Sequence, residues 1–217
     1  MTLFEVVEEM CRNAGLSLDT SSARTSNQVD QFQRMESPAG ILVRRLEKHY
    51  KVKPEGQLGV RVRRLHMAMS PLGKATLDNR PVILFSGHYN RPMCRLHPEL
   101  LFVFGDNRQR VGEGGQACIR PESNVFGVAT KRAPSNGPNA FFRDGVPDDM
   151  GAVCFDLLQL EAKLKEGNRI VLPITPEERI SLGTGLSQLP YHAPLIYMMI
   201  ESWFERIKRT HRFTTVG

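Results

Sequence analysis

Short, continuously apolar runs bounded by Gly, Asn and Pro dominate the pattern of the second half of the chain. They cover positions 82–85 (VILF), 101–104 (LFVF), 125–130 (VFGVAT) and 170–174 (IVLPI). Such runs predict β-strands. Because the runs are apolar at consecutive positions and do not alternate, we expect both faces of each strand to be buried.

Two later segments have apolar residues at helical spacing. Over 153–164 they recur at i, i+4, i+7 and i+11, and Gly167 follows where a glycine commonly ends a helix. A second helix is predicted from Pro194, since proline is favoured in the first helical turn, to Ile207. Strands and helices together predict an α/β fold, a three-layer α/β/α sandwich of roughly 130 residues from about position 80 onward.

The first 75 residues have a different pattern. Apolar residues at helical spacing predict one helix over 3–16 and another over 39–50, and the polar stretch 17–33 between them is typical of a loop or linker. We therefore predict two parts, a mostly helical N-terminal extension at 1–75 and an α/β domain at 76–217.

Positive charge is concentrated in that extension. The whole chain has a formal charge of +6, and positions 41–66 alone hold eight basic and two acidic side chains, so the remainder is formally neutral. The candidate nucleic-acid contacts are Arg44, Arg45, Arg61, Arg63 and Arg64. Such a segment can neutralise phosphates without sequence preference. A strand with one solvated basic face, or a docking segment for an acidic protein, explains the same pattern.

No apolar run reaches the roughly 18 residues of a membrane-spanning helix, and the first residues lack the basic-then-apolar order of a signal peptide. We therefore expect a cytoplasmic protein with no membrane partner. The four cysteines (Cys11, Cys94, Cys118 and Cys154) form no C-x-x-C pair and have no histidine at metal-ligand spacing. The expectation is reduced, structural thiols, with neither a metal nor a bound cofactor.

Two glycine-rich segments lie close to predicted strands, where α/β proteins bind their ligands. The first contains Gly105, Asp106, Asn107, Gly112, Gly114, Gly115 and Gln116, and the second contains Gly183, Thr184, Gly185 and Leu186. Glycines let the backbone approach a ligand closely, and successive amides can bind phosphate oxygens. Neither segment has the spacing of a P-loop or a Rossmann motif. Ordinary tight turns are the alternative interpretation of both.

Several motifs occur here in an order that resembles a family of short, largely uncharacterised bacterial and phage proteins. They are FVFGDN, RVGEGGQA, NVFGVATK, AFFRD and LGTGLSQLP, all between positions 102 and 190. Members look similar to macro domains, which bind ADP-ribose and related nucleotides. The resemblance implies that Gly112, Gly114 and Gly115 contact phosphate, as do Gly183, Thr184 and Gly185 in the second loop. It also implies that Asp106 and Asn107 contact a ribose or an adenine edge.

Three functions fit these features. We expect first a protein that binds a phosphorylated nucleotide of the ADP-ribose type, in a phage or mobile-element setting. The second is a hydrolase of ADP-ribosyl bonds or nucleotide signals, for which the resemblance implies attack by Lys131 with help from Asp106 or Asp144. The Asn-Ala-Ala-Asn segment usual in macro domains is absent, which counts against hydrolysis. The third is binding of nucleic acid or an acidic protein through residues 41–66.

Overall fold

The computed structural model describes residues 44, 47, 72, 73, 75 and 78–216. The chain divides into two compact units, Met1–Leu77 and Asp78–Gly217. In the first unit Arg44 and Glu47 have helical backbone, within the helix expected over 39–50. The rest of that helix, the helix expected over 3–16 and the linker over 17–33 lie outside the described residues. So do four of the candidate nucleic-acid contacts: Arg45, Arg61, Arg63 and Arg64.

The second unit is built on a five-stranded sheet in which every pair of neighbouring strands runs parallel. The strands are β1 (Val82–Phe85), β2 (Leu100–Asn107), β3 (Val125–Lys131), β4 (Arg169–Pro173) and β5 (Phe213–Val216), in the spatial order β3-β2-β4-β1-β5. The four strands expected from the sequence are thus confirmed, and β5 is an addition. The α/β class is also confirmed.

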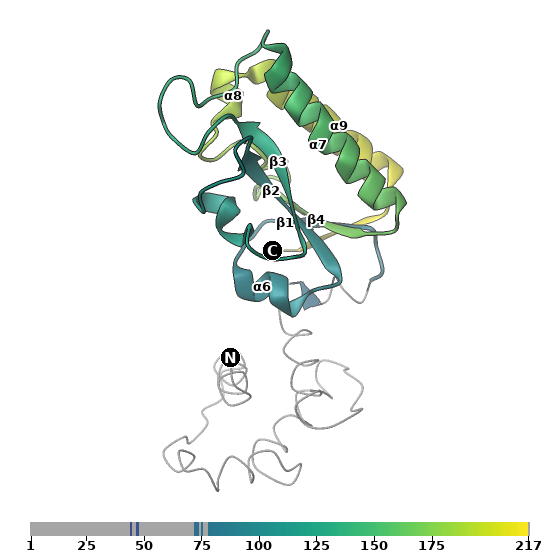
Figure 1. Cartoon of the computed structure of the whole chain (residues 1–217). Helices are drawn as coiled ribbons and strands as arrows, with labels where there is room; N and C mark the ends of the chain where they lie inside the picture. The colour runs from purple at the N-terminus through teal and green to yellow at the C-terminus, as the bar shows by residue number, and fades with distance from the viewer. Residues whose placement is uncertain (1–43, 45–46, 48–71, 74, 76–77, 217) are drawn as a thin grey trace, which may run out of the picture. The chain divides into compact units, whose positions relative to one another are not determined.

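Two groups of helices cover the two faces of this sheet. The helices are α6 (Arg91–Leu96), the 3-10 helix η1 (Gly115–Ile119), α7 (Pro147–Lys165), α8 (Leu189–His192) and α9 (Pro194–Thr210). The chain moves toward one edge of the sheet from β1 to β3 and toward the other edge from β3 to β5. Because parallel crossovers are right-handed, this reversal places α6 and η1 on one face and α7 and α9 on the other. Figure 1 shows α7 and α9 side by side and α6 across the sheet from them.

The central strands are buried on both faces, as their uninterrupted apolar runs predict. Val82 and Leu84 of β1 belong to the large core cluster that includes the inner sides of α7 and α9. Side chains alternate along a strand, so Phe85 points to the opposite face. There it stacks on Tyr89, whose ring meets Phe102 edge to face, both pairs at 5.7 Å between centroids.

The helix boundaries follow local signals in the sequence. Pro194 is the first residue of α9, as expected from proline's preference for the first turn. Gly167 lies just beyond α7 with a φ of +90°, and its N–H donates to the carbonyl of Leu164, which confirms the predicted glycine end. Among the described residues, the structure contains no helix that is both long and apolar enough to cross a membrane.

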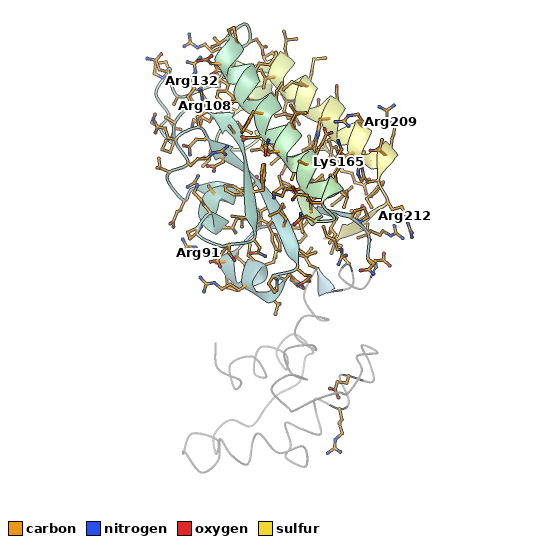
Figure 2. All side chains as sticks on the ribbon, turned by 45° about the vertical axis from the view of Figure 1, so that its right-hand side comes forward. Arg91, Arg108, Arg132, Lys165, Arg209 and Arg212 are labelled. Carbon is orange, nitrogen blue, oxygen red and sulfur yellow. The ribbon has the colours of Figure 1, made fainter. Side chains whose placement is uncertain are left out.

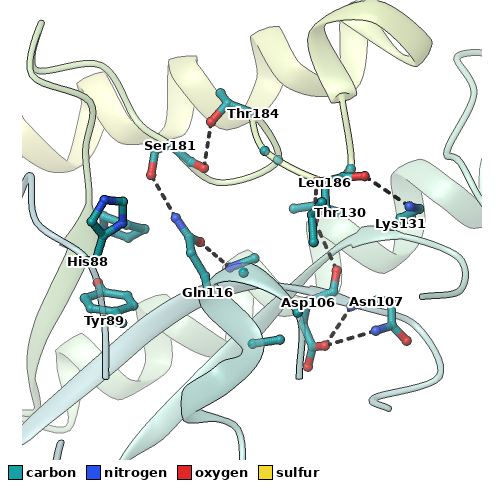
Figure 3. A pocket seen from close by; sticks show the side chains of 18 of the residues that line it. His88, Tyr89, Asp106, Asn107, Gln116, Thr130, Lys131, Ser181, Thr184 and Leu186 are labelled. Carbon is teal, nitrogen blue, oxygen red and sulfur yellow. Dashed lines mark hydrogen bonds between the residues drawn. The ribbon is translucent and has the colours of Figure 1, made fainter. Parts of the chain in front are cut away.

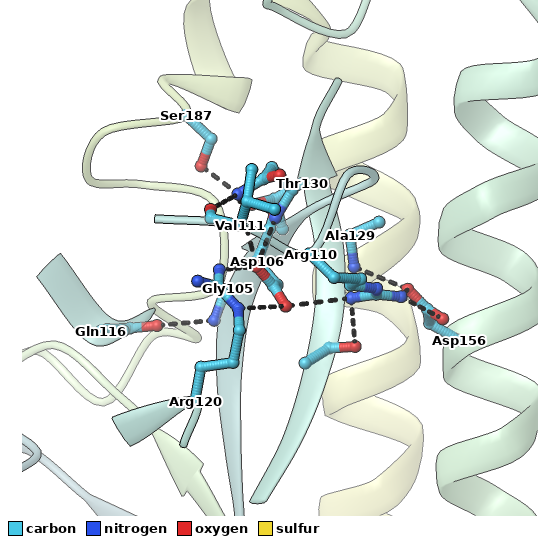
Figure 4. A network of polar contacts seen from close by, with 12 residues as sticks. Gly105, Asp106, Arg110, Val111, Gln116, Arg120, Ala129, Thr130, Asp156 and Ser187 are labelled. Atoms are coloured by element: carbon cyan, nitrogen blue, oxygen red, sulfur yellow. Dashed lines mark hydrogen bonds and ion pairs between the residues drawn. The ribbon is translucent and has the colours of Figure 1, made fainter. Parts of the chain in front are cut away.

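Strand β3 is an edge strand, and side chains satisfy its outward backbone groups. Arg110 donates to the carbonyl of Gly127 at 2.8 Å, and the N–H of Ala129 donates to Asp156 Oδ2 at 2.7 Å. The same Arg110 also donates to both carboxylate oxygens of Asp156, at 2.8 and 2.7 Å, and pairs with Asp106 (Figure 4). Paired in this way, the edge is protected from pairing with another strand.

This arrangement predicts that Gly127→Ala destabilises the protein. A Cβ at position 127 would lie 2.5 Å from Asp106 Oδ2 and 2.9 Å from Asp106 Cβ. Relieving that overlap would displace the buried carboxylate, at a cost of about 1–3 kcal/mol in the free energy of unfolding. Urea titration measures the change. Gly151→Ala is the matched control, because no heavy atom lies within 4 Å of its added Cβ and alanine is the better residue inside α7. Equal effects of the two substitutions would contradict the prediction.

Candidate ligand-binding site

A cleft of about 810 Å³ lies at the carboxyl ends of four strands. It is lined by residues at the ends of β1, β2, β3 and β4 and in the loops that follow them. The strands β3, β2, β4 and β1 are neighbours in this order, and the chain leaves the end of each strand toward the face opposite to that taken after its neighbour. Where connections from adjacent parallel strands leave toward opposite faces, a crevice opens at the carboxyl ends of the strands. Its volume lies in the range of about 300–1,000 Å³ typical of small-molecule sites.

Most of the side chains and glycines singled out from the sequence line this one cleft. They are Gly105, Asp106, Asn107, Gly112, Gly114, Gly115, Gln116, Lys131, Gly183, Thr184, Gly185 and Leu186. The two glycine segments therefore face the same cavity, although about 70 residues separate them along the chain. Asp144 is the exception among the candidates of the second unit, since it does not line the cleft.

Lys131 is the cation of the cleft. Lys131 is only 5% exposed, and its Nζ donates to Asn136 Oδ1 at 3.2 Å and to the carbonyl of Leu186 at 3.0 Å. The ammonium also lies 4.3 Å from the centroid of the Phe141 ring, a cation–π contact. Within the described part of the chain no carboxylate pairs with it, and burial lowers the pKa of Lys131 below its ordinary value. The ammonium is thus held by neutral groups alone.

Three loops come together around this lysine. A Cβ placed on Gly114 would lie 3.2 Å from Leu186 Cδ1, so the second glycine loop packs directly over the first. Likewise a Cβ on Gly112 would lie 3.2 Å from Pro134, in the loop that follows β3. The glycines therefore allow close packing of these loops, in addition to leaving their backbone near the cleft.

Gln116 connects the two glycine segments across the middle of the cleft (Figure 3). Its Oε1 accepts from the N–H of Gly105 and its Nε2 donates to Ser181 Oγ, both at 2.9 Å. The hydroxyl of Thr184 donates to the carbonyl of Ser181 at 3.0 Å, which fixes the turn of the second loop. Both side chains were expected to contact a ligand, and the structure gives each of them a partner within the protein.

The carboxylate of Asp106 is enclosed by arginines. It pairs with Arg110 at 3.4 Å and with Arg120, and its Oδ1 accepts from the N–H of Asn107 at 2.7 Å (Figure 4). Two guanidinium groups around one buried carboxylate leave no net negative charge there. Consequently Lys131 is the dominant uncompensated charge among the residues that line the cleft.

Asp144 does not lie where a catalytic residue that assists Lys131 would have to lie, because it is not among the residues that line the cleft. Its Oδ2 accepts from the N–H of Leu195 at 2.9 Å and its Oδ1 from the N–H of Ile196 at 3.1 Å. These are free amides in the first turn of α9, where a carboxylate also interacts favourably with the helix dipole. The geometry therefore gives Asp144 a capping function.

Asp149 holds the loop that surrounds Lys131. This carboxylate is completely buried in the first turn of α7 and accepts from Arg132 Nε at 2.9 Å and Nη2 at 2.6 Å. It also accepts from the backbone N–H of Arg143 at 3.0 Å. Both ends of the loop 132–143 are thus fixed to one side chain, and this loop contributes Asn136 and Phe141 to the surroundings of Lys131.

Several basic side chains outside the cleft lie near one end of the sheet or the other. Arg108 and Arg132 are near the carboxyl ends of the strands, and Lys165, Arg209 and Arg212 are near the far ends of α7 and α9 (Figure 2). Arg132 is neutralised by Asp149. Because Lys131 is the one lysine or arginine among the described residues that line the cleft, the positive charge that faces the cleft comes from it.

Sequence reasoning missed one side of the cleft. Ser86, Gly87, His88 and Tyr89, which follow β1, form part of the lining. The rule that ligands bind beyond the carboxyl ends of strands identifies the segment after 82–85 as readily as the glycine loops. Without a glycine pattern, however, this segment gave no separate signal.

Thiols and possible metal ligands do not form a second site in the described residues. No group of three or more His, Cys, Asp or Glu side chains there is placed to hold a metal ion. Burial, with lesser contributions from Glu122 and Cys118, raises the pKa of the Cys94 thiol to about 12. Cys118 donates to the carbonyl of Tyr89 at 3.3 Å. Such contacts are those of packed, structural thiols.

Comparison with known proteins gives one match. Residues 84–203 match the model of DUF7831, which is described as a family of unknown function. No curated protein and no solved structure was found to match the chain. The matched segment runs from β1 into α9 and contains every residue that lines the cleft.

Proposed function

This chain belongs to DUF7831, a family of unknown function, and from its cleft we propose that the protein binds a phosphorylated nucleotide of the ADP-ribose type. The observation that carries the proposal is Lys131, a buried ammonium that has no carboxylate partner within the described residues. Burying an unpaired charge is costly. An anionic group in the cleft would supply the missing counter-charge.

The glycine loops favour phosphate over other anions. The backbone N–H groups of Gly112, Gly114 and Gly115 donate no hydrogen bond within the described residues, and these glycines line the same cleft as Lys131. Successive free amides together with a lysine are the groups that bind phosphate oxygens in many nucleotide sites. The likeness of the sequence motifs to macro domains adds the expectation of an ADP-ribose-type ligand.

The contacts of Asp106 and Asp144, the two acidic residues considered for catalysis, favour binding over hydrolysis. The carboxylate of Asp106 is neutralised by Arg110 and Arg120, and that of Asp144 caps α9. A hydrolase that uses Lys131 as nucleophile needs a proton acceptor to keep the amine neutral, and both carboxylates already have other partners. We therefore propose a binding protein.

The proposal is tested by thermal unfolding of the full chain with ADP-ribose, ADP, inorganic pyrophosphate and a short DNA duplex at two salt concentrations. A ligand at 100 times its dissociation constant adds about 2.7 kcal/mol of stability, or about 5–10 °C in Tm. We expect ADP-ribose to produce such a shift at both salt concentrations. A shift with DNA alone, lost at high salt, would overturn the proposal and favour binding through the basic residues 41–66.

We further expect Gly185→Glu to weaken ADP-ribose binding at least about tenfold without lowering the Tm of the free protein. Position 185 lines the cleft, and no heavy atom lies within 4 Å of a Cβ placed there. The substitution therefore adds a negative charge at the site without a steric conflict. Isothermal titration calorimetry measures the affinity. Ser202→Glu, on the exposed side of α9, makes the same charge change away from the cleft and serves as control.

A further inference from the structure

The cleft is too long for a phosphate group alone. Lys131 stands at the end of β3 and His88 follows β1, with β2 and β4 between these two strands. Neighbouring strands lie about 4.8 Å apart, so three spacings separate the two ends by about 14 Å along the sheet. An anion beside Lys131 therefore occupies one end and leaves the β1 end open.

The open end has a different chemistry. It is lined by the segment after β1, which contains Ser86 and His88, and by Thr175 after β4. The imidazole of His88 is exposed and points into the cleft (Figure 3). Its neighbour Tyr89 is buried, and the Tyr89 hydroxyl already donates to the carbonyl of Val171 at 3.1 Å. His88 is thus the side chain with an aromatic face and unused ring nitrogens at this end, among the described residues.

Glycines line the middle of the cleft. Gly105, Gly183 and Gly185 belong to the lining on the β2 side and in the loop after β4, and a Cβ placed on Gly185 would have no heavy atom within 4 Å. Gln116 lies there too, and its amide is held by Gly105 and Ser181. A ligand that reaches both ends passes beside this fixed amide.

Resting on the proposed function, we propose that the ligand is an elongated nucleotide whose phosphates and one sugar or base are recognised separately, at the two ends of the cleft. The phosphate lies beside Lys131 and the amides of the first glycine loop. The sugar or base at the far end contacts the imidazole of His88, which hydrogen-bonds or stacks on it. His88 is therefore the residue that distinguishes a long nucleotide from a short phosphate compound.

The test compares two probes of different length on three forms of the full-length protein. Calorimetry measures the affinities of inorganic pyrophosphate and ADP-ribose for the wild type, His88→Ala and Lys131→Met. We expect His88→Ala to weaken ADP-ribose binding about tenfold and to change pyrophosphate binding less than about twofold. We expect Lys131→Met to weaken the binding of both. His211→Ala controls for loss of an imidazole, because His211 precedes β5 and therefore lies at the amino ends of the parallel strands, away from the cleft.

The other outcomes separate the two proposals. If His88→Ala leaves ADP-ribose binding unchanged, or weakens both probes equally, the assignment of His88 is overturned and the anion site at Lys131 stands. The same conclusion follows if the wild type binds pyrophosphate as tightly as ADP-ribose. If the wild type binds neither probe, both the proposed function and this inference fail.

Discussion

Replacement of Lys131 by methionine is expected to weaken ADP-ribose binding about 100-fold, the loss associated with a charge-assisted hydrogen bond in a buried site. The same substitution is expected to leave the Tm of the free protein unchanged or to raise it. Ligand affinity falls and the Tm of the free protein does not, because an anionic ligand stabilises the buried ammonium. Without a ligand, the ammonium has only the Asn136 side chain, the Leu186 carbonyl and the Phe141 ring as partners. Methionine keeps the length of the side chain and removes the desolvated charge.

The pH dependence of stability gives an independent check on the same lysine. Burial lowers the pKa of Lys131 in the folded chain below its ordinary value of 10.5. Between the two pKa values the unfolded chain binds more protons, so the wild type gains stability as pH rises through that window. Lys131→Met lacks this contribution. The stability of the variant relative to the wild type should therefore be greatest below the window and should decline as pH approaches 10.5.

Lys165→Met is the matched control for both measurements, because Lys165 is exposed at the end of α7. It should change neither ligand affinity nor the dependence of stability on pH. Undiminished ADP-ribose binding by Lys131→Met would contradict the anion site. A large fall in Tm for that variant would show that the lysine stabilises the empty protein, contrary to its lack of a carboxylate partner.

Asp149→Ala is expected to cause the largest loss of stability, about 2–4 kcal/mol in the free energy of unfolding. The reason is that removing one member of a buried ion pair leaves the charge of the other without a counter-charge. Three donors lose their acceptor at once, namely Nε and Nη2 of Arg132 and the backbone N–H of Arg143. Because the Arg132 side chain is 28% exposed, water replaces part of the lost interaction. The expected fall in Tm is about 5–12 °C for a chain of this size.

Asp148→Ala is the control for this prediction. Asp148 is exposed one residue earlier in the same helical turn, so its removal changes the charge near the α7 N-terminus without breaking the buried pair. Calorimetric unfolding of the two variants should differ by most of the predicted loss. If Asp148→Ala and Asp149→Ala lose equal stability, the loss comes from the lost interaction of a carboxylate with the helix dipole. The assignment of Asp149 as the anchor of the loop 132–143 is then wrong.

Asp106 and Asp144 show where prediction from sequence reached its limit. Both are acidic residues close to glycine or aromatic residues in the chain, and the sequence gives no means of telling a catalytic carboxylate from a structural one. The distinction depends on partners that are distant along the chain. Asp106 meets Arg120 and Asp144 meets the first amides of α9, about 50 residues later.

By itself the sequence determined the α/β class, the strands β1 to β4, the start of α9 at Pro194 and the position of the glycine segments. These features depend on local causes: the length of apolar runs, the spacing of apolar residues, and the backbone preferences of glycine and proline. The strand order and the burial of Lys131 were decided only by the tertiary structure. They depend on which chain segments cover each face of the sheet, and on loops far apart in sequence meeting at the ends of the strands. The cleft, and the isolation of its one lysine from any carboxylate in the described residues, exist only once those loops have come together.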